Sequence, residues 1–172
     1  MKTLSIVLLC IAAAILYGII HDQITARICV EYFTIGHVDL FHTADPTLLG
    51  IGWGIAATWW VGLALGMGLA YAARHGPAPS RSISSLIRPV ATLMAITGLC
   101  AAAAGVIGYT SACAHLVTLT GEMAVEVPAG RQIALLTDLW IHNASYDVGF
   151  IGGIILCVKV WRSRAKHGPA NS

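Results

Sequence analysis

The chain has 172 residues, of which 57% are hydrophobic and 10% are charged, and its mean hydropathy is +0.77. A soluble globular domain carries about 25% charged residues, so the composition excludes an ordinary water-soluble fold and favours an integral membrane protein. The formal net charge is +2, and the basic residues form no stripe interleaved with aromatics. We therefore expect no nucleic-acid partner.

Four apolar stretches are long enough to cross a bilayer, which takes about 20 residues. We expect spans at about residues 4–21, 47–73, 89–115 and 134–161, with outer segments 22–46 and 116–133, a cytoplasmic loop 74–88 and a tail 162–172. The first stretch resembles a secretory signal, but it ends without a small-residue cleavage site, so we interpret it as a retained helix. Residues 1–172 are thus predicted to form a single all-α membrane domain, a four-transmembrane-helix bundle.

The distribution of charge predicts the orientation. Eight of the ten Lys and Arg residues lie near the N-terminus, in the second connection or near the C-terminus: Lys2, Arg74, Arg81, Arg88, Lys159, Arg162, Arg164 and Lys166. By the positive-inside rule, both termini are cytoplasmic and the protein is a multi-pass protein of a bacterial-type inner (plasma) membrane. All eight acidic residues then fall on the opposite, periplasmic side.

The first outer connection has local signals of its own. It contains no Gly or Pro before Gly36, and Arg27 and Glu31 have i,i+4 spacing, so we expect helix 1 to continue beyond the membrane and to stop at Gly36. Asp45 followed by Pro46 predicts a helix N-cap with proline at the first helical position.

The second span is rich in glycine, with Gly50 and Gly54 four residues apart and Gly62 and Gly66 repeating the spacing. Small residues at this spacing let helices approach closely within membrane lipid. Tight packing inside the bundle is the favoured interpretation. The alternative is a homo-oligomer, or a partner membrane protein that binds through this helix.

Histidines from three spans are expected at the same outer boundary. His21 ends the first span, His115 ends the third, and His142 lies about 28 Å before Trp161 along a helix axis. Imidazole nitrogens and carboxylate oxygens bind zinc and other divalent transition metals. We therefore predict a metal site, with the ligand candidates His21, His115, His142, Asp147, Glu31 and His37.

A metal ion that activates water would make hydrolysis of a lipid-like substrate the simplest chemistry at this site. The catalytic candidates are Asp22, Asp138, Ser145 and Tyr146, of which Asp138 and Tyr146 share the helix face of His142 at i−4 and i+4. Asp138 is also suited to orient the imidazole by accepting its second N–H. The alternative is structural, with these polar groups capping helix ends and holding the bundle in register.

Asp147 lies five residues deeper in the membrane than His142. An unpaired carboxylate at this depth is expected to become neutral or to find a partner. The candidate partners are Arg27, Tyr109, Thr110 and Ser111.

Cysteines and tryptophans leave further alternatives open. Cys29 and Cys113 are both on the predicted outer side, where a disulfide and two free thiols are equally expected. Trp59 and Trp60 lie deep in the second span, where they either pack a core or line a cofactor pocket. The functional alternatives to a metal site are therefore a noncatalytic accessory or assembly subunit and a redox module that binds haem b or a quinone.

Overall fold

The computed structural model describes residues 2–165 and is all-helical, with 80% helix and no strand in that range. Four helical segments are long and apolar enough to cross a membrane, namely Thr3–Ile28, Pro46–Arg74, Ser84–Cys113 and Ala129–Arg164. They correspond in number and order to the four predicted stretches, although their ends differ by several residues. The third helix begins at Ser84 and carries Pro89 within its second turn.

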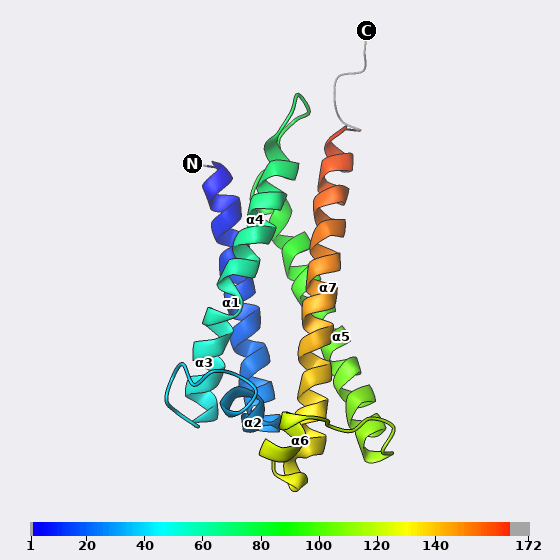
Figure 1. The fold of residues 1–172 in the computed structure, drawn as a ribbon. Helices are drawn as coiled ribbons and strands as arrows, with labels where there is room; N and C mark the ends of the chain where they lie inside the picture. Colours follow the sequence, from blue (N-terminus) through cyan, green and yellow to red (C-terminus); the bar gives the residue numbers. More distant parts are fainter. Residues whose placement is uncertain (1, 166–172) are drawn as a thin grey trace.

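The helices associate as two pairs. In the first pair, α1 (Lys2–Ile28) packs along α3 (Pro46–Ala56) and α4 (Trp59–Arg74), and in the second α5 (Ser84–Cys113) packs along α7 (Gln132–Ala165). The pairs meet mainly through α4 and α7, whereas direct contact between α1 and α7 is sparse. The N-terminal end of α1 and the C-terminal end of α7 lie at the same end of the bundle (Figure 1).

Glycines explain the close approach of α1 to the second span. A side chain at Gly62 would collide with the backbone of Cys10 and Ile11, and one at Gly66 with the backbone of Val7. Helices in contact through glycine backbone gain dispersion contacts that larger residues would prevent. These glycines are therefore used for packing inside the bundle.

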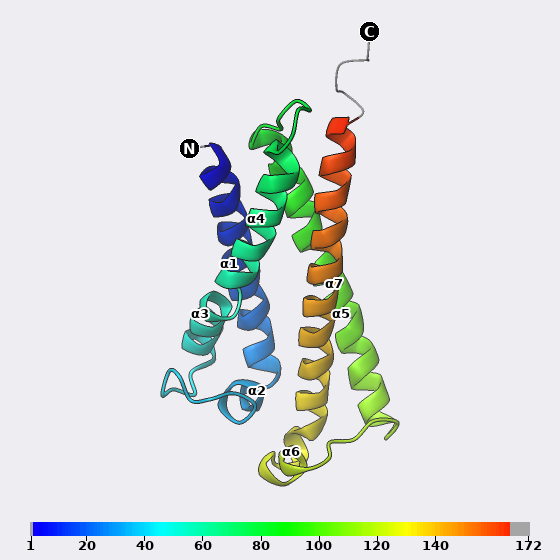
Figure 2. The ribbon, with the colours of Figure 1, turned by 45° about the horizontal axis from the view of Figure 1, so that its top comes forward.

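The second span is not the continuous helix that we predicted. It is interrupted at Ala57 and Thr58, and α3 and α4 are distinct segments in Figures 1 and 2. The Thr58 hydroxyl donates to the carbonyl of Gly54 at 2.5 Å, and a Cβ on Gly18 of α1 would collide with both residues. A threonine that bonds back to its own helix promotes bending, and here the bend coincides with a close approach of α1.

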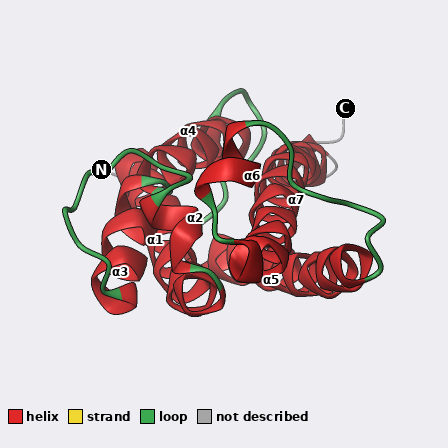
Figure 3. Cartoon of the chain, turned by 60° about the horizontal axis from the view of Figure 1, so that its bottom comes forward, coloured by secondary structure: helices red, strands yellow, loops and turns green. Residues whose placement is uncertain are grey.

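The end of the bundle opposite the termini is covered by short helices. After a break at Cys29, α2 (Val30–Thr34) turns across this end and closes at Gly36. The stop at Gly36 is as predicted, but the helical residues before it form a separate short helix instead of a continuation of α1. The predicted cap is also confirmed, because Asp45 Oδ1 accepts from the backbone N–H groups of Thr47 and Leu48 at 2.9 and 2.8 Å. In Figure 3, α2 and α6 (Glu122–Glu126) lie across this end, and the 3₁₀ turn η1 (Ala129–Arg131) leads into α7.

Two apolar clusters form the core, one near each end of the bundle. The cluster near the termini contains Ile6, Leu69, Leu86, Val90 and Val160, with smaller residues between them. The cluster under α2 contains Tyr32, Phe33, Leu49, Val127 and Leu135. The buried polar residues of α1 and α7 include His142, Asp22 and Asp138, which lie on the inner side of α2.

Candidate metal centre

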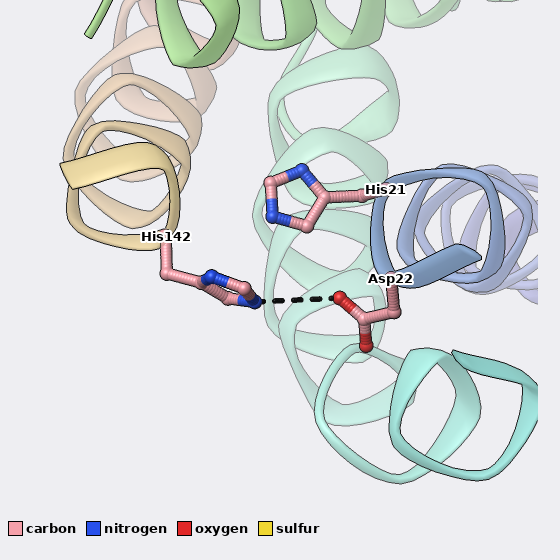
Figure 4. Close-up of side chains that lie close together, drawn as sticks. All are labelled: His21, Asp22 and His142. Carbon is pink, nitrogen blue, oxygen red and sulfur yellow. Dashed lines mark ion pairs between the residues drawn. The ribbon is translucent and has the colours of Figure 1, made fainter. Parts of the chain in front are cut away.

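A group of three potential metal ligands lies on the seam between the two helix pairs. His21 and Asp22 are consecutive residues of α1, and His142 reaches toward them from α7 (Figure 4). One ligand atom from each residue lies within 4.8 Å of the other two. This confirms that His21 and His142 converge at one level of the bundle, as their estimated depths predicted.

His142 is held between two buried carboxylates. Its Nε2 atom lies 3.5 Å from Asp22 Oδ1, and its Nδ1 atom lies 3.4 Å from Asp138 Oδ1. Nδ1 is also 3.0 Å from the backbone carbonyl oxygen of Asp138. Because a backbone carbonyl oxygen can only accept, Nδ1 carries a proton, and Nε2 is the atom that faces Asp22.

His21 is oriented by two hydroxyl groups. Its Nδ1 atom lies 3.4 Å from Tyr17 Oη and 3.4 Å from Ser145 Oγ, and these two oxygens are 2.7 Å apart. The opposite ring nitrogen, Nε2, is buried and has no hydrogen-bond partner among the described residues. Leaving such a group unsatisfied costs about 1–3 kcal/mol, so its lone position beside Asp22 and His142 requires an explanation.

An aromatic layer covers the outer side of His142. The Tyr32 ring stacks on the His142 ring with centroids 4.1 Å apart, and the Phe33 ring lies at 5.9 Å. His37 packs against Tyr32 at 4.8 Å and against Trp53 at 4.6 Å. The aromatic residues of α2 therefore shield the group, and His37 belongs to this cover rather than to the ligand set.

Glu31 also belongs to the cover, where it ties α2 to the start of α7. Its Oε1 atom accepts from Arg131 Nε at 2.9 Å, and Arg131 also donates to the carbonyl of Ile28 at 3.0 Å. The hydrogen bond from Arg131 lowers the pKa of Glu31 below its usual value. The Glu31 carboxylate thus forms an ion pair with Arg131, called the latch below, that holds α2 against the start of α7. The structure does not bring Glu31 into the group of three.

The predicted alternatives for Cys29 and Cys113 are resolved in favour of free thiols. Cys29 is buried beneath α2 and donates to Glu31 Oε2 at 3.3 Å, while Cys113 is exposed at the end of α5. Burial raises the pKa of Cys29 to about 12. Cys29 is therefore an inert packing residue of the cover.

His115 is not brought to the group. It lies in the turn after α5, is exposed, and has a left-handed backbone with φ of 56°. Gly108 packs on Trp140, so the part of α5 level with His142 is about two turns before His115. The predicted depth was wrong because α5 continues past the level of the site before it ends at Cys113.

Asp147 is not brought to the group either. Five helical residues after His142 correspond to a rotation of about 140°, so the two side chains point in different directions from α7. Asp147 is exposed, and its candidate partner Arg27 instead bonds Gln23 and Thr47. The hydroxyl candidates Tyr109, Thr110 and Ser111 follow Gly108 and lie at or beyond the level of Trp140.

The remaining site predictions have different outcomes. Asp138 contacts the far side of the His142 ring and Ser145 the far side of the His21 ring, so both residues are placed to position a ligand. Tyr146, the other catalytic candidate on this helix face, is 47% exposed. Trp59 and Trp60 are 47% and 53% exposed, so they do not form a buried core, and the lining of a cofactor pocket stays a prediction. The rings of His21 and His142 meet edge to face with centroids 4.7 Å apart, which leaves no space for a porphyrin between them.

Sequence reasoning missed Tyr17 and Tyr32. Tyr17 lies four residues before His21 on the same helix face, and this i,i+4 spacing was a usable signal. Tyr32 had no such signal, because its stacking on His142 depends on the break at Cys29 that turns α2 across the bundle.

Comparison with known proteins adds nothing to this geometry, because no family model, no curated protein and no solved structure matches the chain.

Proposed function

We propose that this chain is a membrane metalloprotein that binds one divalent transition-metal ion, with zinc as the best match, through His21, Asp22 and His142. The observation that carries the proposal is the convergence of these three ligand atoms within 4.8 Å, with the buried His21 Nε2 lacking a hydrogen-bond partner among residues 2–165. Two imidazoles and one carboxylate are an established ligand set for catalytic zinc.

The surroundings of the ligands support the same proposal. Metal-binding histidines commonly donate their second ring N–H to a carboxylate or carbonyl, and Asp138 offers both groups to His142 Nδ1. His21 has a comparable arrangement with the hydroxyls of Tyr17 and Ser145. Both rings are thus held with Nε2 directed into the shared space.

Hydrolysis is the chemistry that we propose for the site. A three-residue ligand set leaves a coordination position open for water, and a bound metal ion lowers the pKa of that water so that it becomes a nucleophile near neutral pH. Asp22 is the carboxylate in the ligand group and Asp138 positions His142. Because the spans are expected to lie in lipid, a lipid-like ester or phosphoester is the proposed substrate class.

The proposed location is a bacterial-type inner membrane with both termini in the cytoplasm. The support is the placement of Arg74, Arg81, Arg88 and Arg164 at the end of the bundle that holds the termini, together with the positive-inside rule. The metal group is then on the periplasmic half of the bundle. A reporter fused to the C-terminus is expected to be active only in the cytoplasm.

The test of the proposed function is elemental analysis of detergent-purified protein that has been stripped, reloaded with zinc and desalted. Wild-type protein is expected to retain one zinc per chain, and His142→Ala is expected to retain little. His115→Ala is the matched control, because it removes a histidine that lies outside the group, and it should retain zinc as wild type does. Equal zinc contents in wild type and His142→Ala would contradict the proposal.

Catalysis is tested on the same samples. Zinc-loaded wild type is expected to hydrolyse at least one member of a panel of lipid-like esters and phosphoesters, and both chelation and His142→Ala should abolish the activity. Retained zinc without hydrolysis across the panel would confine the proposal to metal binding.

A further inference from the structure

Two neighbouring shallow cavities, both widely open to the surface, lie at the end of the bundle that holds the termini, far from the metal group. The first has a volume of about 380 Å³ and is lined by Arg74, Arg81 and Ile83 with the serines 80, 82 and 84. The second has a volume of about 390 Å³ and lies between α1 and α4, where Val7, Met67 and Tyr71 are among its lining residues. Arg74 lines both cavities, so they adjoin.

The first cavity offers cationic and hydroxyl groups without a carboxylate. All ion pairs of residues 2–165 involve Asp22, Glu31, Asp39 or Asp138, none of which lines this cavity. Arg81 donates to Ser163 Oγ at 2.9 Å, and among the described residues the hydrogen bond of Arg74 is a 3.5 Å contact with the carbonyl of Arg81. Two guanidinium groups therefore keep donors available, and a guanidinium matches a phosphate geometrically as well as in charge.

The second cavity has the character of a site for a hydrocarbon chain. Met67 precedes Arg74 by about 10 Å along the axis of α4, so this cavity extends from the arginine toward the apolar part of the span. Its side chains include Val7, Met67 and Ala70. The first cavity is lined by two arginines and three serines, and the second shares Arg74 and continues along Val7 and Met67. Together they match a molecule with an anionic head and an acyl chain.

The level of the two cavities also fits a lipid headgroup. Arg74 ends one candidate span and Ser84 begins the next. Tyr71, His75 and Trp161 stack beside them, with centroids 4.4 Å apart for Tyr71 and His75 and 5.8 Å for Tyr71 and Trp161. Stacked aromatics at the end of a span are typical of the membrane–water interface.

We infer that Arg74 and Arg81 form a binding site for the phosphate group of an anionic phospholipid, whose acyl chain lies in the adjoining groove along Met67 and Val7. Basic pockets between transmembrane helices are established sites for anionic headgroups. The inference rests on the proposed membrane insertion but not on the metal, because the two sites lie at opposite ends of the bundle.

The test uses delipidated full-length protein in a neutral detergent. The probes are phosphatidylglycerol, phosphatidylcholine with the same acyl chains, and inorganic phosphate. Retained lipid is measured by native mass spectrometry and stabilisation by thermal unfolding. Phosphatidylglycerol is expected to bind and to raise the unfolding temperature, phosphatidylcholine to bind much more weakly, and inorganic phosphate to have little effect because it lacks the chain.

Arg74→Gln/Arg81→Gln is expected to weaken phosphatidylglycerol binding about 30-fold, or about fivefold for each arginine. Arg88→Gln is the matched control, because Arg88 is exposed in the first turns of α5 but does not line the cavity. Lipid-free unfolding temperatures of both variants show whether they fold as wild type does. Repeating the titration on zinc-free protein separates this result from the metal proposal.

Three results would overturn the inference. Equal binding of the two lipids would show that the phosphate charge is not selected. An equal loss in Arg88→Gln would show a diffuse basic surface instead of a site. Stabilisation by inorganic phosphate alone, at the level seen with phosphatidylglycerol, would identify a site for free phosphate.

Discussion

Asp138→Ala is the substitution that most sharply separates positioning of the metal ligand from simple packing. Asp138 is fully buried, and its carboxylate lies 3.4 Å from His142 Nδ1 with no hydrogen-bond partner in the described part of the chain. Removing a group that orients a metal ligand costs about 10- to 100-fold in metal affinity. The backbone carbonyl of residue 138 stays 3.0 Å from the same nitrogen, so we expect the lower end, about tenfold.

The affinity is measured by competition between the protein and a chromophoric zinc chelator. Thr137→Val is the control, because Thr137 is the buried neighbour and its hydroxyl donates to the carbonyl of Ile133 at 2.8 Å, away from the metal group. An unchanged zinc affinity in Asp138→Ala, or an equal loss in Thr137→Val, would refute the positioning role. If His142 were instead an imidazolium held by two carboxylates with no metal, Asp138→Ala would destabilise the protein by about 3–5 kcal/mol and zinc would have no effect.

Three further predictions concern the fold around the site. Arg131 lowers the pKa of Glu31, so the ion pair stabilises the fold above the ordinary glutamate pKa, and this stability is lost as the pH falls through the lowered pKa. Unfolding temperatures measured between about pH 6 and 3 should therefore fall more steeply in wild type than in Glu31→Gln. In folded protein a maleimide should label Cys113 rapidly and leave Cys29 unmodified, as read by peptide mass spectrometry, and a reductant should make no difference. Gly62→Ala should lower the unfolding temperature, because the new methyl group meets the backbone of α1, and the cost is expected to be about 1–3 kcal/mol.

Each of these predictions has an outcome that contradicts it. Parallel pH profiles for wild type and Glu31→Gln would show that the latch carries no stability. Labelling of Cys29 at the rate of Cys113 would mean that α2 does not cover it. For the glycine, Gly149→Ala is the control, since its Cβ would meet only ordinary contacts, and equal effects at both positions would reflect helix propensity instead of close packing.

The helical architecture was largely predictable because its signals are local. The length of each apolar run predicts the spans, and Asp45-Pro46 and Gly36 predict a helix start and a helix stop through backbone chemistry confined to a few residues. The interruption near Thr58 was not predictable in this way. It coincides with contact between Gly54 and Gly18, which are far apart in the sequence.

The candidate site was predicted only in part, for the same reason. His21 and His142 converge because both lie at similar distances from the ends of long helices, which counting residues estimates well. His115 was placed at the end of its span without such a count, and α5 in fact continues past the level of the site. The rotation of Asp147 away from the site was calculable from helix geometry, but the stacking of Tyr32 on His142 required the turn of α2 in three dimensions.

The central claim is that His21, Asp22 and His142 form one metal site. X-ray absorption at the zinc edge of loaded wild-type protein tests it most directly, because it reports which elements and how many imidazoles coordinate the metal. We expect two imidazole nitrogens, further oxygen ligands and no sulfur, and we expect His115→Ala to give the same spectrum. Failure to load zinc, sulfur ligation, or a spectrum unchanged in His142→Ala would contradict the account.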